Sequence, residues 1–177
     1  MQPKYDNAKD SGFTLIELMI VLVIISVIVS LGAPALSETV KRNQLQTQAN
    51  RILSTLTLTR SEAVKRNQAV SICRSSDGAS CTGDWGDGWI VFTNIDSDDT
   101  VDIGVDTVIR VYSGLKSNYT LSGAVSADTL TYYADGSYAG DAGSIDICAV
   151  DADVIHNWSV ILNTVGRPRA KQGASCS

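Results

Sequence analysis

The sequence predicts an α+β protein in which one long N-terminal helix packs on antiparallel β-sheet. Two observations lead to this fold class. An apolar run that begins at Phe13 continues into residues at helical spacing, and beyond Asn67 the pattern changes to short β-like runs. Clusters of Gly, Asp, Ser and Asn separate these runs, as is typical of turns. Several strands at short spacing after a single helix favour a sheet that covers the helix's apolar stripe.

The first element is an apolar run from Phe13 to Leu36, in which Glu17 is the only charged residue. A run of this length can cross a bilayer as one helix, and a carboxylate inside it is costly enough to indicate a function. No small-residue cleavage site follows the run, unlike the arrangement in a secretory signal. The polar leader, residues 1–12, carries two lysines and is expected to stay cytoplasmic. Residues 13–36 are then a transmembrane segment, and residues 37–177 form one extracytoplasmic globular domain.

The helix is predicted to continue as an amphipathic segment to about residue 67, which gives one helix of about 50 residues. Basic residues fall mostly between its apolar positions. The ordinary role of such a basic face is a solvated surface, and contact with acidic neighbours or phosphates is the alternative. The apolar positions are Leu36, Val40, Leu45, Ala49, Ile52, Leu53, Leu56, Ala63 and Val64.

Six strands are predicted after the helix, without internal repeats and without a second domain. Each candidate is a short run rich in β-branched and aromatic residues, bounded by turn residues. The candidate strands are residues 69–73, 88–93, 107–113, 130–134, 144–149 and 158–165.

The four cysteines agree with an oxidising compartment and allow three disulfide pairings. We favour Cys73–Cys81, which closes a short loop, and Cys148–Cys176, which staples the C-terminal tail to a strand. A metal site is the competing interpretation, but close Cys-x-x-Cys pairs are lacking and His156 is the only histidine. The sequence therefore predicts no metal site and no cofactor.

The residues around the start of the apolar run, Gly12-Phe13-Thr14-Leu15-Ile16-Glu17, resemble the class III signal of type IV pilins and pseudopilins. The resemblance implies that a prepilin peptidase cleaves between Gly12 and Phe13 and that Phe13 becomes the N-methylated terminus. It also implies that Glu17, the fifth mature residue, is matched with the N-terminal amine of a neighbouring subunit during assembly.

Two further blocks narrow the resemblance. Arg60-Ser61-Glu62-Ala63 at the end of the helix and Gly88-Trp89-Ile90-Val91-Phe92 in a strand are similar to the GspH/FimT/FimU group of minor pilins and pseudopilins. Membership implies a pilin-like fold and partnership with major and other minor pilins. It also implies a single-pass inner-membrane anchor with its N-terminus inside, and a place in a type IV pilus on the surface of a Gram-negative bacterium.

The C-terminal tail is a basic segment of a chain that is acidic overall. Residues 154–177 hold three cations and no acid, whereas residues 94–153 hold eleven acids and two cations, and the whole chain has a net charge of −5. The net negative charge opposes nucleic-acid binding by the chain as a whole, but it is compatible with a local basic binding site. The cations are Arg167, Arg169 and Lys171, and alternate residues of an extended segment project to one side.

The segment Gly166-Arg167-Pro168-Arg169 resembles the DNA-binding motif of FimT-like minor pilins. The resemblance implies that Arg167 and Arg169 contact phosphates, with Lys171 and Gly166 in support. The predicted function is a minor type IV pilin, not an enzyme, that binds double-stranded DNA weakly and without sequence specificity during uptake for natural transformation. The alternatives are a structural minor pilin that primes pilus assembly and the H-type pseudopilin of type II secretion.

An acidic stretch after the second predicted strand has the alternating oxygens of a calcium-binding loop from Asn94 to Asp102. It has Asp99 where such a loop needs glycine and Val105 where the bidentate glutamate should be. We therefore expect a solvated acidic turn.

Overall fold

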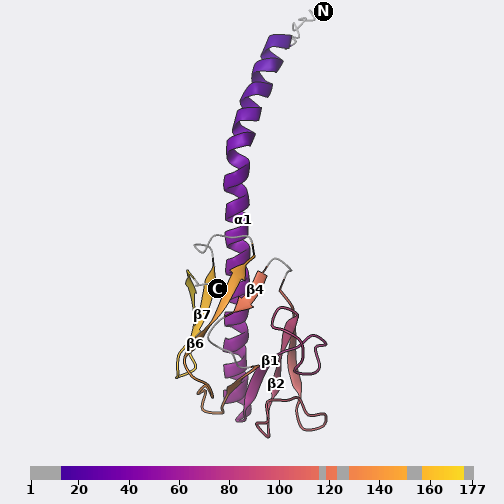
Figure 1. Cartoon of the computed structure of the whole chain (residues 1–177), viewed down its shortest axis with the longest axis vertical. Coiled ribbons are helices and arrows are strands. Elements are labelled where there is room, and N and C mark those ends of the chain that lie inside the picture. The colour runs from indigo at the N-terminus through magenta and orange to yellow at the C-terminus, as the bar shows by residue number, and fades with distance from the viewer. Residues whose placement is uncertain (1–12, 116–118, 123–127, 151–156, 174–177) are drawn as a thin grey trace, which may run out of the picture. The chain divides into compact units, whose positions relative to one another are not determined.

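The computed structural model describes residues 13–115, 119–122, 128–150 and 157–173. The chain divides into two compact units, Met1–Lys41 and Arg42–Ser177, and each is described by itself. In the described residues, one helix, α1, is followed by eight strands, and Figure 1 shows their arrangement within each unit. Their bounds are α1 Leu15–Arg66, β1 Val70–Arg74, β2 Gly88–Thr93, β3 Val108–Ser113, β4 Tyr119–Ser122, β5 Thr129–Tyr132, β6 Gly143–Ala149, β7 Trp158–Leu162 and β8 Pro168–Gln172.

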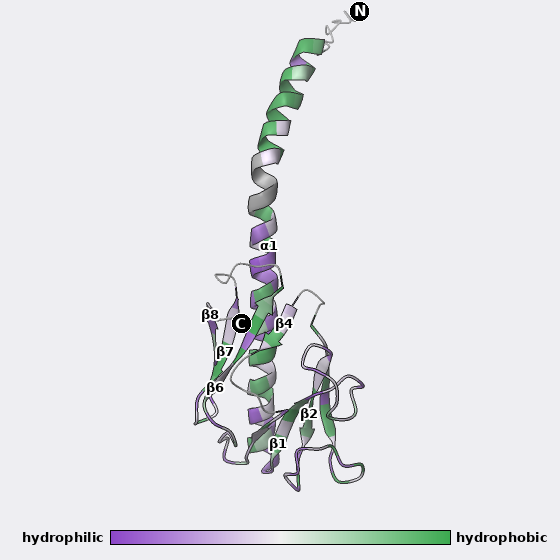
Figure 2. Ribbon diagram, in the orientation of Figure 1, coloured by the Kyte–Doolittle hydropathy of each residue, from purple (hydrophilic) through white to green (hydrophobic). Residues whose placement is uncertain are grey.

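The first unit contains the N-terminal part of α1, whose side chains from Leu15 to Val29 are exposed and mostly apolar (Figure 2). The helix begins where Thr14 Oγ1 accepts a hydrogen bond from the Glu17 N–H at 3.3 Å, as an N-cap does. Within the described part of the chain, no helix is both long and apolar enough to span a membrane. The leader, residues 1–12 with Gly12, lies outside the described residues.

The second unit contains two four-stranded sheets. Sheet 1 has the order β3-β2-β1-β5 and sheet 2 has the order β4-β6-β7-β8. All of the strand pairs in both sheets are antiparallel. The outermost strands are therefore β3 and β5 in sheet 1 and β4 and β8 in sheet 2.

The core forms where both sheets bury side chains with the C-terminal part of α1. The helix contributes Leu45, Ala49, Ile52 and Leu56, which are spaced three or four residues apart and fully buried. The strands contribute large side chains to the same cluster, among them Trp89, Tyr132, Ile147, Val160 and Leu162. The threonines of α1 that face this core donate their hydroxyl groups to the carbonyls four residues earlier, as Thr59 does to Thr55 at 2.9 Å.

The predicted fold class is confirmed, and the predicted helix end at about residue 67 agrees with the observed end at Arg66. The six predicted strands are present with small shifts at their ends, although the last one stops at Leu162 rather than Val165. Two strands were not predicted. The sequence indicates no strand at Tyr119–Ser122, and it indicates an extended tail rather than a paired strand at Pro168–Gln172.

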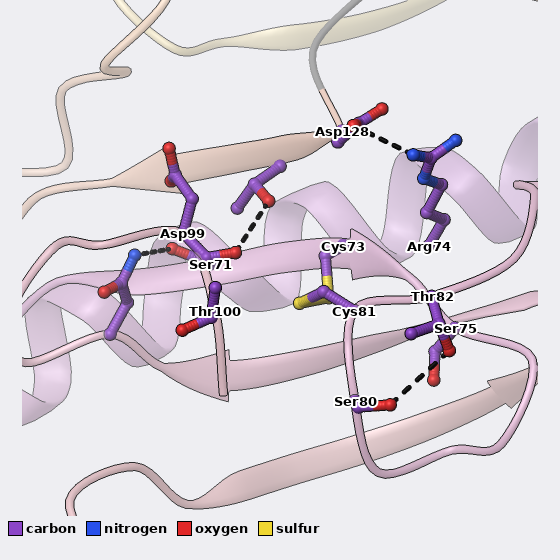
Figure 3. Close-up of a disulfide and its surroundings, with 12 residues drawn as sticks. Ser71, Cys73, Arg74, Ser75, Ser80, Cys81, Thr82, Asp99, Thr100 and Asp128 are labelled. Carbon is purple, nitrogen blue, oxygen red and sulfur yellow. Dashed lines mark hydrogen bonds and ion pairs between the residues drawn. A yellow bond between two sulfur atoms is a disulfide. The ribbon is translucent and has the colours of Figure 1, made fainter. Parts of the chain in front are cut away.

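Cys73 of β1 forms a disulfide with Cys81, the first of the two pairings that the sequence favours (Figure 3). The bridge lies on the outer side of sheet 1, where Cys73, Ile90 and Phe92 form a second small buried cluster. Cys148 is also disulfide-bonded. Its predicted partner Cys176 lies outside the described residues, as does His156.

Candidate functional site

The basic tail of the sequence is an edge strand in the structure. β8 pairs with β7 over its whole length, with Arg169 opposite Ile161 and Lys171 opposite Ser159. Ala170 lies between them opposite Val160, which is fully buried in the core. Because successive side chains of a strand point to opposite faces, Arg169 and Lys171 lie together on the outer face, and both are exposed.

The turn between β7 and β8 fixes the backbone of Arg167. Asn163 accepts two hydrogen bonds: its carbonyl oxygen from the Gly166 N–H at 2.8 Å, and its side-chain Oδ1 from the Arg167 N–H at 2.7 Å. Arg167 enters the strand immediately before Pro168, with its side chain exposed. The hydrogen bonds of Asn163 therefore order the turn that presents Arg167 next to the cations of β8.

The backbone conformation and the close packing at position 166 require glycine. Its φ is +73°, which disfavours any residue with a Cβ, and a Cβ here would lie 2.8 Å from Cε1 of Tyr132 and 3.1 Å from Cβ of Tyr138. The residue is buried against these two tyrosines. Gly166 is predicted to support the DNA contacts, but the residue is buried, and its backbone conformation forms the turn before Arg167.

The three tail cations have no ion-pair partner within the described ranges. The ion pairs found there join Glu62 to Lys65 and Arg66, and Arg74 to Asp84 and Asp128. Figure 3 shows Arg74 reaching Asp128, at 2.9 Å, from the strand that carries Cys73. Arg167, Arg169 and Lys171 are thus available to a partner outside this unit.

The acidic loop follows β2, in the other sheet. Carboxylate oxygens of Asp96, Asp98 and Asp102 lie within 4.8 Å of one another. Repulsion by these neighbours, Asp98 first, raises the pKa of Asp102. Asp98 accepts hydrogen bonds from the N–H and hydroxyl of Thr100, and Asp106 accepts them from the Ile95 and Asp102 N–H groups. Asp98 of this cluster and the neighbouring Asp106 therefore already order the loop itself.

The tryptophans belong to the core rather than to an exposed stacking surface. Trp89 is fully buried and donates its Nε1–H to Thr55 Oγ1 at 3.3 Å. Trp85 and Trp158 pack as partly buried side chains against the same cluster. The described tryptophans are consequently poor candidates for stacking on bases.

A long N-terminal helix whose C-terminal part packs on two antiparallel sheets defines a pilin-like α+β protein. The model of the family described as type II transport protein GspH matches residues 48–166, and the chain belongs to this family. The prokaryotic N-terminal methylation motif matches residues 7–33. The chain is therefore a minor type IV pilin or pseudopilin of the GspH/FimU type, a class that implies prepilin processing and association with other pilins.

Solved structures of two minor pilins or pseudopilins have the same fold. The type IV minor pilin FimU of Pseudomonas aeruginosa is 25% identical, with a TM-score of 0.61, over 77% of this chain and 97% of that chain. The minor pseudopilin EpsH from the type 2 secretion system of Vibrio cholerae is 14% identical, with a TM-score of 0.53, over 75% and 99% of the two chains. No curated protein matches the sequence. The GspH match ends at Gly166, immediately before the tail cations.

Proposed function

We propose that this minor pilin binds double-stranded DNA through Arg167, Arg169 and Lys171 and acts in DNA uptake during natural transformation. One observation carries the proposal: three exposed cations at alternate positions on and beside an edge strand, without an acidic partner among the described residues. Guanidinium groups bind phosphate bidentately, and the ammonium group of lysine binds it as a point charge. Before assembly, the chain would be a single-pass inner-membrane protein with its N-terminus inside.

The arrangement lowers the cost of binding because the backbone of the cations is already ordered. β8 is held in register by β7, and Asn163 fixes the turn before Arg167. Association with DNA then has to order only the ends of long side chains rather than a free tail. The ordered backbone of β8 supports a DNA site there over a role for the cations as an unstructured basic tail.

The contacts determine the kind of binding expected. Phosphate contacts position a protein on the duplex without reading its sequence. Three such contacts correspond to a slope of about −2 to −3 in the logarithm of affinity against the logarithm of salt concentration. With a net charge of −5 on the whole chain, the affinity of one subunit should be low, and firm capture needs several subunits or partners.

A second candidate is a subunit of an assembled fibre that does not bind DNA, in which the same cations contact an acidic surface of a neighbouring pilin. The GspH family match and the fold shared with EpsH favour this role, either as a structural minor pilin or as the H-type pseudopilin.

The test is DNA binding by the full-length processed chain in a neutral detergent, with a fluorescent duplex at several salt concentrations between about 50 and 200 mM. Wild-type chain is compared with Arg167→Ala/Arg169→Ala and with the matched control Lys65→Ala/Arg110→Ala, which removes the same charge elsewhere. We expect salt-sensitive binding by wild type and the control and loss of binding in the tail variant. If wild type does not bind at low salt, or the tail variant binds equally well, the DNA proposal is wrong.

The uptake step is tested in cells that carry the same variants. The tail variant is expected to lose DNA uptake while its number of pili stays that of wild type. Loss of the pili themselves would favour the structural role.

A further inference from the structure

Arg60 of α1 lies against the turn that connects β5 to β6. This turn is closed by hydrogen bonds from the Tyr133 N–H to Ser137 O at 3.0 Å and from the Gly136 N–H to Tyr133 O at 2.8 Å. Gly136 faces the arginine so closely that a Cβ at this glycine would lie 3.2 Å from Nε and 3.5 Å from Nη2 of Arg60. The helix thus places a guanidinium group directly on the β5–β6 turn.

The same turn also contacts the β7–β8 turn. A Cβ at Gly166 would lie 3.2 Å from the carbonyl oxygen of Gly136, as well as against Tyr132. Burial raises the pKa of the Tyr132 phenol, and the positive charge of Arg60 partly opposes this rise. Arg60 and Gly166, the residue before Arg167, therefore both lie against Gly136, although they are far apart in the sequence.

The charge of Arg60 is not neutralised by a described residue. Arg60 takes part in none of the ion pairs found in the described ranges. The carboxylate of the same turn, Asp135, accepts hydrogen bonds from the N–H of Ser137 at 2.8 Å and from its hydroxyl at 2.6 Å. Burial keeps Tyr132 neutral by raising its pKa, so the phenol is not a counter-charge. Arg60 itself is partly exposed.

We propose that Arg60 is a fourth phosphate contact for DNA, so that the binding surface continues from β8 across the β5–β6 turn onto α1. The inference rests on the proposed function of the tail cations. The proposed path of the DNA starts at Arg169 and Lys171 on the outer face of β8, passes Arg167, and reaches Arg60 beside Gly136. Arginine suits this position because its planar group can both lie on the turn and bind phosphate bidentately.

The charge of Arg60 is tested with Arg60→Gln, Arg60→Lys and Arg110→Gln in the full-length chain in neutral detergent. Arg110 is an exposed arginine of β3, on the other sheet, so its variant reports the effect of net charge alone. We expect Arg60→Gln to weaken binding severalfold at low salt and to make the salt slope less steep by about one. Arg60→Lys should keep the slope, and Arg110→Gln should keep both slope and affinity.

A second measurement uses the wild-type chain and so does not depend on the folding of any variant. Phenylglyoxal modification of Arg60 is followed by mass spectrometry with and without saturating duplex. We expect DNA to protect Arg60 together with Arg167 and Arg169, and to leave Arg110 unprotected. Unchanged modification of Arg60 in the presence of bound DNA overturns the inference.

The outcomes separate this inference from the function on which it rests. If Arg60→Gln binds DNA as wild type does while Arg167→Ala/Arg169→Ala does not bind, Arg60 is not a contact and the proposed function stands. Equal losses in Arg60→Gln and Arg110→Gln also overturn the inference, because they indicate a net-charge effect. Absence of DNA binding by wild type overturns both proposals.

Discussion

The two sheets of this protein contribute to one core but present opposite charges at their borders. Both are four-stranded and antiparallel, and both bury side chains together with the same stretch of α1. Beside sheet 1, the connection from β2 to β3 carries the clustered carboxylates of Asp96, Asp98 and Asp102. Sheet 2 ends in β8, with Arg169 and Lys171 exposed. The core therefore determines the fold, while the borders of the sheets determine which charges a partner meets.

The two borders are also held in different ways. In sheet 1, the Cys73–Cys81 disulfide closes the connection after β1, and Arg51 of α1 donates to the carbonyls of Ser113 and Gly114 at the end of β3. The Arg51 guanidinium also lies 4.6 Å from the ring centre of Trp89. In sheet 2, the β7–β8 turn is held by the close approach of Gly166 to Tyr132 and by the hydrogen bonds of Asn163. The cationic contacts of Arg51 at the end of β3 thus contrast with the tight packing of the β7–β8 turn.

The largest effect is expected from Gly166→Ala, which tests the packing of sheet 2. The new Cβ would have an unfavourable backbone conformation and would overlap Tyr132, so we expect the free energy of unfolding to fall by about 2–4 kcal/mol. The matched variant is Gly173→Ala, with a φ of +95° but no atom within 4 Å of its Cβ position. It should lose only about 1–2 kcal/mol. Chemical denaturation followed by circular dichroism measures both, and equal losses would contradict the role of Tyr132.

A smaller loss is expected when the disulfide of sheet 1 is removed in Cys73→Ala/Cys81→Ala. The two cysteines are eight residues apart, and closing a loop of this size in the unfolded chain corresponds to about 2–3 kcal/mol of stability. DNA binding should not change, because the tail cations belong to the other sheet. Denaturation and duplex titration of the same sample check both statements. Loss of DNA binding in a folded variant would show that the two borders are coupled.

The smallest effect concerns pH and the loop that the disulfide closes. Asp77 accepts hydrogen bonds from the hydroxyl and N–H of Ser80 and from the Ala79 N–H, and these bonds lower its pKa, with the Ser80 hydroxyl making the largest contribution. The folded pKa is thus below the unfolded value of about 4. The stabilisation by ionised Asp77 is complete above that value and is lost as the pH falls toward the folded pKa.

Thermal unfolding of wild type and Asp77→Asn measures this effect. The difference between their melting temperatures should be constant above about pH 5 and shrink as the pH falls below about 4. A difference that does not vary with pH would mean that the charge of Asp77 does not stabilise the loop.

The elements that the sequence predicts well are those whose pattern is local. The strand at residues 88–93 is a continuous apolar run between turn residues, and its predicted bounds are those of β2. β8 is not predicted because Pro168 and two cations are poor strand formers. The segment is a strand because it pairs with β7. β4 is only four residues long, so its alternation of apolar and polar residues is too short to stand out in the sequence, and the strand is defined by its pairing with β6.

The candidate site divides in the same way. The contrast of charge along the sequence is enough to single out Arg167, Arg169 and Lys171. The roles of Asn163 and Arg60 depend on contacts between turns, such as Gly136 with Gly166, that no local pattern records. Gly166 illustrates the limit, because the sequence places it beside the DNA contacts but does not reveal its burial against two tyrosines.

The position of Pro168 at the start of β8 has a consequence for crowded subunits. An edge strand with free N–H and C=O groups is a template on which another strand can continue the sheet, and this route leads to aggregation. Proline removes one of the donors, and repulsion between like charges on β8 disfavours the addition of a second β8 strand. In a protein that assembles beside related subunits, Pro168 and the cations therefore disfavour the pairing of β8 with a strand of a neighbouring subunit.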